Sequence, residues 1–209
     1  MFESRVTANI VKLESGMYDD EIDIASFDQQ KTQRDPATSR ETRPNTAKIM
    51  RVPNHGMVFQ LMSGDEVESM IIPIEGKGLW STLYGFIALS GDTRTIQGIT
   101  FYQHGETPGL GGEVDNPRWK ALWPGRLAFD DNWKPVSEVL QGRAGSVEDD
   151  PHHVDGMAGA APTATGGWNK RPVSVCDPRV GPPVVQCEGQ RRAAVVAQVV
   201  RDAWTQHGL

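Results

Sequence analysis

The chain has 209 residues, of which 38% are hydrophobic, and a formal net charge of −6. This length gives room for one domain, or for one domain and a tail, and the acidic balance argues against a general nucleic-acid binder, whose affinity depends on a basic surface. No stretch approaches the roughly 18 apolar residues of a membrane span, and residues 1–10 lack the apolar centre of a signal peptide. As given, the chain is therefore expected to be soluble.

Two clusters of possible metal ligands or redox groups give only weak signals. The two cysteines are Cys176 and Cys187, and no histidine stands near them with the spacing of a zinc site. A disulfide and two free thiols both stay open. Residues 148–153 (EDDPHH) hold carboxylates and imidazoles, but Pro151 breaks any helix that would align them, and no second cluster completes a site. The sequence therefore predicts no metal ion.

The first fifth of the chain carries weak signals of secondary structure. Residues 1–16 mix apolar and polar side chains and are expected to pair as an early strand. Apolar spacing over residues 24–33 indicates a short helix, which Asp35 and Pro36 end. Residues 32–45 are polar and predict a loop.

Four segments of strand character follow, separated by short stretches with turn chemistry. Their regular spacing predicts a largely antiparallel meander, and Pro73 indicates that the second segment lies at an edge or contains a bulge. The four segments span residues 57–62, 70–74, 83–89 and 96–102.

A glycine-rich loop occupies residues 105–117 (GETPGLGGEVDNP), directly after the fourth segment. Glycine lets such a loop turn sharply and brings backbone N–H groups close to a ligand. The loop fits neither the dinucleotide fingerprint nor the P-loop, so a tight turn and a ligand site both stay open. Asn116 and Pro117 predict a helix start, and Trp119, Leu122 and Trp123 share one face of that helix, more in keeping with core packing than with a stacking platform. Residues 136–140 are expected to form another strand.

Three stretches together resemble one known family. They are residues 76–84 (GKGLWSTLY), 98–126 (GITFYQHGETPGLGGEVDNPRWKALWPGR) and 153–160 (HVDGMAGA). In these stretches the chain resembles the C subunit of the sodium-translocating NADH:quinone oxidoreductases, a family of FMN-binding domains. The G subunit of the Rnf electron-transport complex is a related alternative, although the unbroken GKGLWS and GEVDNP-W stretches favour the sodium pump.

The resemblance implies an α+β fold, a largely antiparallel sheet with flanking helices. It implies an FMN that a separate flavin transferase joins by its phosphate to a threonine hydroxyl, and that passes electrons between neighbouring subunits. In the family an N-terminal membrane helix, absent from this chain as given, holds the domain on the periplasmic side of a bacterial inner-membrane complex that reduces ubiquinone and transports sodium. Carried over residue by residue, the implied FMN-binding positions are Leu79, Trp80, Glu106, Thr107, Gly109, Leu110, Gly111, Asp155, Gly159, Ala160, Ala161 and Thr163.

The chain departs from the family at the attachment motif, which here reads DGMAGAAPT over residues 155–163. The family's serine position is Ala158, and its threonine acceptor position is Ala161. Alanine has no oxygen, so a phosphoester cannot form there, and the hydroxyls of Thr163 and Thr165 stand out of register for a positioned reaction. The sequence therefore predicts FMN that is bound without this covalent link, or no FMN at all.

The resemblance ends near residue 166. We expect an FMN-binding domain over residues 1–166 and an atypical tail over residues 167–209, either disordered or translated from a shifted reading frame. Two functions follow: an FMN-carrying redox subunit, or a flavin-free structural or binding module of a membrane redox complex. A stand-alone enzyme is disfavoured, because no nucleophile and base can be paired, and His104 is expected to be a structural hydrogen-bonding residue.

Overall fold

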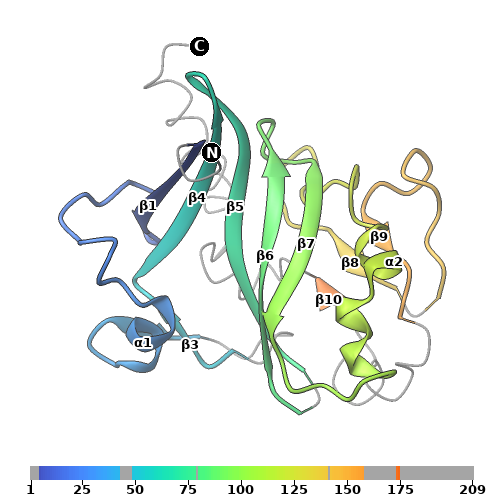
Figure 1. Ribbon diagram of the computed structural model, residues 1–209, viewed down its shortest axis with the longest axis horizontal. Coiled ribbons are helices and arrows are strands. Elements are labelled where there is room, and N and C mark those ends of the chain that lie inside the picture. The colour runs from blue at the N-terminus through green and yellow to red at the C-terminus, as the bar shows by residue number, and fades with distance from the viewer. Residues whose placement is uncertain (1–4, 43–48, 79, 141, 158–172, 175–209) are drawn as a thin grey trace.

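The computed structural model describes residues 5–42, 49–78, 80–140, 142–157 and 173–174. Its main feature is a five-stranded antiparallel sheet in the order β1-β4-β5-β6-β7 (Figure 1). The strands are β1 (Val6–Lys12), β4 (His55–Ser63), β5 (Glu66–Lys77), β6 (Thr82–Ser90) and β7 (Ile96–Gln103). The predicted early strand, meander and fold class are thereby confirmed.

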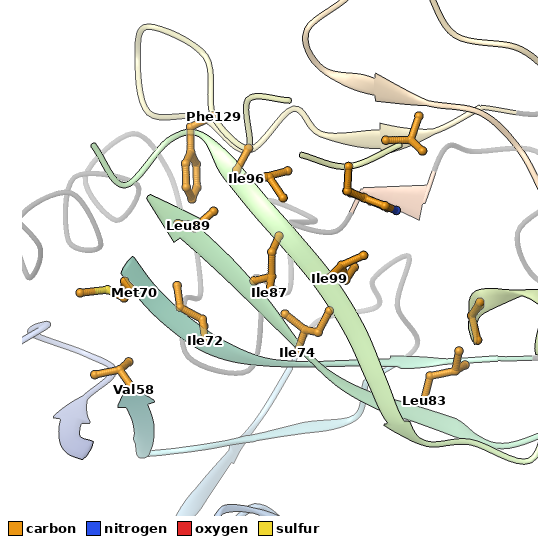
Figure 2. Close-up of a cluster of buried hydrophobic side chains, with 14 of the residues drawn as sticks. Val58, Met70, Ile72, Ile74, Leu83, Ile87, Leu89, Ile96, Ile99 and Phe129 are labelled. Atoms are coloured by element: carbon orange, nitrogen blue, oxygen red, sulfur yellow. The ribbon is translucent and has the colours of Figure 1, made fainter. Parts of the chain in front are cut away.

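The sheet buries one of its faces. Alternate residues of β6 point to opposite sides, so that Leu83, Ile87 and Leu89 are buried while their neighbours are partly exposed. Figure 2 shows these side chains beside apolar side chains from β5 and β7 and beside Phe129, which comes from the segment after the sheet. Burial of each large aliphatic side chain contributes about 1.5–3 kcal/mol, so this face supplies most of the core.

Pro73 does not have the place that its type predicts. The sequence predicts an edge or a bulge at Pro73, but β5 is a central strand, paired with β4 on one side and with β6 on the other. Pro73 pairs with Phe86 of β6, while the pairing of β5 with β4 ends at Ile71 and its bulge lies on β4 at Leu61. The strand accommodates the missing N–H because the β4 ladder has already ended at that level.

The helix α1 (Gln29–Arg34) is shorter than the predicted 24–33 segment. Asp28 caps it by accepting a hydrogen bond from the Lys31 N–H at 3.0 Å. Before it, the Asp23 carboxylate accepts a bond from the Ala25 N–H at 3.1 Å, a local contact that competes with helix formation. The helix packs against β3 (Arg51–Pro53), which pairs with β2 (Ser39–Glu41).

The segment after β7 covers the buried face of the sheet. It contains the 3-10 helix η2 (Gly111–Asp115) and α2 (Pro117–Lys120), and Asn116 caps α2 as predicted. The helix ends before Leu122 and Trp123, yet Trp119 and Trp123 are both buried and meet edge to face at 5.5 Å. Their predicted role in core packing is confirmed. Beyond them lies a small sheet in the order β10-β8-β9, formed by β10 (Val173–Ser174), β8 (Glu138–Val139) and β9 (His153–Val154).

Apart from β10, the expected tail over residues 167–209, with both cysteines, lies outside the described residues. Within the described part of the chain, no helix has the length and apolar character needed to cross a lipid bilayer.

Candidate functional site

Two loops lie at the same end of the main sheet. The hairpin turn, residues 78–81, joins β5 to β6, and the glycine loop, residues 104–112, follows β7. Lys77 at the end of β5 pairs with Thr82 at the start of β6. Tyr84, two residues further along β6, pairs with Gln103 at the end of β7. Antiparallel pairing therefore brings segments about 25 residues apart in sequence to one edge of the sheet (Figure 1).

Polar side chains tie the two loops together. The Ser81 hydroxyl oxygen accepts a hydrogen bond from the Gly105 N–H at 2.6 Å. The Glu106 carboxylate oxygen Oε1 accepts bonds from the N–H groups of Trp80 at 3.0 Å and Ser81 at 3.2 Å. Glu106 is only 6% exposed. Its carboxylate is therefore directed at the backbone of the hairpin turn and fixes the position of that turn.

The hairpin turn also requires glycine at position 78. A Cβ atom on Gly78 would lie 2.4 Å from Glu106 Oε1 and 2.4 Å from the Cδ1 atom of Leu83. Both distances are far below van der Waals contact. The close approach of Glu106 to the turn thus depends on Gly78.

The glycine loop is a tight turn, one of the two structures that its sequence left open. The carbonyl oxygen of Thr107 accepts hydrogen bonds from the N–H groups of Leu110 at 3.1 Å and Gly112 at 3.0 Å. Gly109 has a φ of +75°, a conformation that glycine adopts without strain. This geometry leaves Thr107 and Leu110 exposed and Gly111 buried.

A hydrogen-bonded cluster holds both ends of the glycine loop. His104 Nδ1 accepts from the Glu106 N–H at 3.3 Å, so Nε2 carries the proton and donates to Asp115 at 2.6 Å. Lys120 bonds the other Asp115 oxygen at 2.9 Å. Partial burial by itself would raise the pKa of Asp115, but the hydrogen bonds from His104 and Lys120 outweigh it and the pKa is lowered. His104 thus has the structural role expected from the sequence.

The surface of the two loops presents apolar side chains. Trp80 of the hairpin turn is 67% exposed and Leu110 of the glycine loop is 38% exposed. Large apolar side chains exposed on neighbouring rigid loops are typical of a binding surface. Leu79, expected to supply a second apolar wall, lies outside the described residues.

Asp155 leads toward the expected attachment motif. Its backbone oxygen accepts a hydrogen bond from Trp119 Nε1 at 3.0 Å, and its carboxylate accepts one from the Ala144 N–H at 2.7 Å. The chain is therefore anchored to the core three residues before position 158. The remaining expected site residues fall outside the described part of the chain: Gly159, Ala160, Ala161 and Thr163.

Sequence reasoning missed the structural roles of Gly78 and Ser81. It considered Gly78 only as part of a P-loop and did not consider Ser81. For a different cluster, the acidic residues 148–153, the structure shows His153 bonded to Asp150 and near Glu138. Among the residues that the structure describes, no group of three or more histidine, cysteine or acidic residues could hold a metal ion.

Comparison with known proteins identifies relatives of the chain. A family model described as an FMN-binding domain matches residues 78–166, which include both loops. A Pseudomonas aeruginosa protein, named as the C subunit of a Na(+)-translocating NADH-quinone reductase, is 44% identical over 172 residues, covering 79% of this chain and 65% of the relative. The protein of the same name from Vibrio parahaemolyticus is 46% identical over 144 residues, covering 68% of this chain and 54% of the relative.

Solved structures agree with these relatives. The crystal structure of Shewanella oneidensis NqrC superposes with a TM-score of 0.71 at 36% identity, covering 80% of this chain and 77% of that one. The structure of the protein of the same kind from Parabacteroides distasonis, at 22% identity, has a TM-score of 0.57 over 93% of this chain and 77% of that one, and supports the fold. The chain spans slightly less than two thirds of the curated relative from Pseudomonas, 65% of its length.

Proposed function

Since this chain belongs to the family of the C subunits of the Na(+)-translocating NADH-quinone reductases, we propose that it is an FMN-binding redox subunit of such a complex. Its partners would be the other subunits of that membrane complex, and its domain would lie on the periplasmic side. The observation that carries the proposal is the pair of tied loops with Trp80 and Leu110 exposed, inside the segment that the FMN-binding family model matches. All curated relatives described above bear the sodium-pump name, which favours this family over the Rnf subunit.

The residues of the two loops fit a flavin. An isoalloxazine ring is planar, with an apolar body and a polar edge. Trp80 and Leu110 supply exposed apolar surface on loops that Ser81 and Glu106 hold in place. The exposed hydroxyl of Thr107 and the bare backbone beside Gly109 suit the polar edge. Glu106 acts by positioning the hairpin turn rather than by touching the ring.

FMN, when bound, supplies electron transfer, which no side chain of the described part of the chain offers. The protein's share is to orient the ring and to tune its reduction potential through hydrogen bonds and burial. Because the two loops are held by internal hydrogen bonds, little ordering would be required when the flavin binds. Transfer of electrons between neighbouring subunits, with sodium transport and ubiquinone reduction, would belong to the whole complex.

The attachment position decides how the flavin is held. Position 161 is alanine, which has no hydroxyl to receive a phosphoester. FMN would therefore be bound by the two loops without a covalent link at this position. A flavin transferase would act on this chain only at another hydroxyl, with Thr163 the nearest candidate.

Intact mass under denaturing conditions tests this proposal. The chain and its Ala161→Thr variant are co-expressed with a flavin transferase of the family. We expect an increase of one FMN unit for the variant alone, which would show that the domain is sound and that Ala161 removes the link. An FMN-sized increase on the unchanged chain would move the link to another hydroxyl, and the variant Thr163→Val would then identify it. No increase on either chain would count against the carrier function.

Ala161 favours one alternative of a different class, a flavin-free binding or structural module of the same complex. The two are separated by non-covalent flavin. A purified chain that takes up FMN from solution is a carrier, and one that does not is a module.

A further inference from the structure

A groove with a volume of about 460 Å³ lies on the face of the main sheet that points away from the core. Its floor is formed by residues that alternate with the buried ones, and α1 forms one wall. This volume lies in the range of small-molecule sites. The floor includes Phe59 of β4, Glu75 of β5, Tyr84 and Phe86 of β6, and Tyr102 of β7.

The groove exists because β4 and β5 separate. Their pairing ends at Phe59 and Ile71, two residues before Pro73. The Met57 N–H, left without a β5 partner, donates to the side-chain oxygen of Gln29 at 2.9 Å. A glutamine of α1 thus takes the place of a strand, and the groove is built into the fold.

Aromatic rings line the floor in a continuous row. The rings of Tyr84 and Tyr102 stack with centroids 6.4 Å apart, those of Phe86 and Tyr102 lie 5.1 Å apart, and Phe59 meets Phe86 edge to face at 6.0 Å. The faces of such rings carry partial negative charge and attract organic cations.

The charged groups of the groove have one sign. The carboxyl groups that line it are those of Asp28 and Glu75, and the described residues that line it include no lysine, arginine or histidine. The Glu75 carboxyl accepts a hydrogen bond from the Gln33 amide. Burial raises the pKa of Glu75 to about 7, although Gln33 and Arg34 act in the opposite direction. A cation in the groove would compensate the ionised carboxylate for the water it has lost.

From the cavity, its row of rings and its unbalanced carboxylates, we propose that this groove is a binding site for a small arylalkyl primary amine. The ammonium group would pair with Glu75, and the apolar body would lie against Tyr84, Phe86 and Tyr102. The site lies on the opposite sheet face from Trp80 and Leu110 and does not depend on flavin binding.

Isothermal titration of the full chain at pH 8 tests the proposal with three probes of the same shape: 2-phenylethylamine, 2-phenylethanol and 3-phenylpropionate. We expect the amine to bind at least about tenfold more tightly than the alcohol, since the ion pair and the cation–π contacts favour the charge. The carboxylate should show no binding. Equal affinities for amine and alcohol, or no amine binding at millimolar concentration, would overturn the proposal.

Two variants locate the effect. Glu75→Gln should reduce the amine's affinity to that of the alcohol and leave the alcohol's affinity unchanged, which also shows that the groove is still formed. The matched control is Glu66→Gln, at an exposed position of the same strand, and it should change neither. Loss of amine binding in the control, or retention in Glu75→Gln, would contradict the assignment.

The pH dependence provides a third readout. Because the amine requires ionised Glu75, its affinity should rise about tenfold from pH 6 to pH 8 in the unchanged chain, and this rise should vanish in Glu75→Gln. A rise that persists in the variant would assign the effect to a different group. The other ionisable groups around Glu75 are Asp28 and Arg34 beside or within α1, Arg51 of β3, which pairs with Glu41, Tyr84 of β6 and Tyr102 of β7.

Discussion

Replacing Glu75 with glutamine should remove a pH-dependent penalty on folding. Burial raises the pKa of this carboxyl from 4.5 to about 7 in the folded protein. Between these values the folded state binds more protons than the unfolded state, so stability falls as the pH rises. With these two pKa values, the free energy of unfolding should drop by about 2.5 kcal/mol between pH 5 and pH 8 on account of this group alone.

Urea denaturation measures the effect. Unfolding free energies of the unchanged chain and of Glu75→Gln are determined at pH 5, 6, 7 and 8, and the difference between the two curves isolates Glu75 from all other groups. Glutamine keeps the shape of the side chain and a partner for Gln33. We expect the variant to gain about 2–3 kcal/mol relative to the unchanged chain over this range. Parallel curves would refute the reasoning, because they would mean that Glu75 is solvated and ionised normally in the folded state.

Three further predictions concern the loops. Gly78→Ala should cost about 1–3 kcal/mol in urea, because its Cβ would collide with Glu106, whereas Gly76→Ala, with open space around the added atom, should cost little; equal costs would be inconsistent with the clash. Glu106→Ala should destabilise by about 1–3 kcal/mol by leaving two N–H groups unpaired, and Glu106→Gln, which keeps an acceptor oxygen, should cost less. The lowered pKa of Asp115 means that its stabilising contribution is present above its unfolded pKa and is lost as the pH falls through the folded value. Asp115→Asn should therefore flatten the acid limb of the stability curve, and an unchanged limb would show that the contacts with His104 and Lys120 are weak.

The sequence was sufficient for the sheet because its signal is local. Alternation along residues 83–89 and turn chemistry between the strands predict the meander, and the structure confirms it. The limits of β5 were missed. The strand continues to Lys77 because Glu75 and its neighbours pair with the start of β6, a contact that no local pattern reveals.

The loops show the opposite case. Glu106 was expected at the flavin, yet its carboxylate is buried against the backbone of the hairpin turn. The bond between Ser81 and Gly105 likewise joins polar residues from two separate loops. Such contacts carry no periodicity, so only the folded arrangement reveals them. The groove beside α1 escaped for the same reason, since it depends on where β4 and β5 separate.

Binding of FMN to the purified chain is the most direct test of a flavin site at the two loops. Quenching of FMN fluorescence is recorded as the chain is added, with Gly78→Ala, Gly76→Ala and Leu110→Asp alongside. We predict saturable quenching by the unchanged chain and by Gly76→Ala, and affinities at least about tenfold weaker for Gly78→Ala and Leu110→Asp, because the first displaces the hairpin turn and the second replaces apolar surface with charge. The absence of saturable quenching by the unchanged chain at millimolar protein, or equal affinities for all four chains, would contradict a flavin site between these loops.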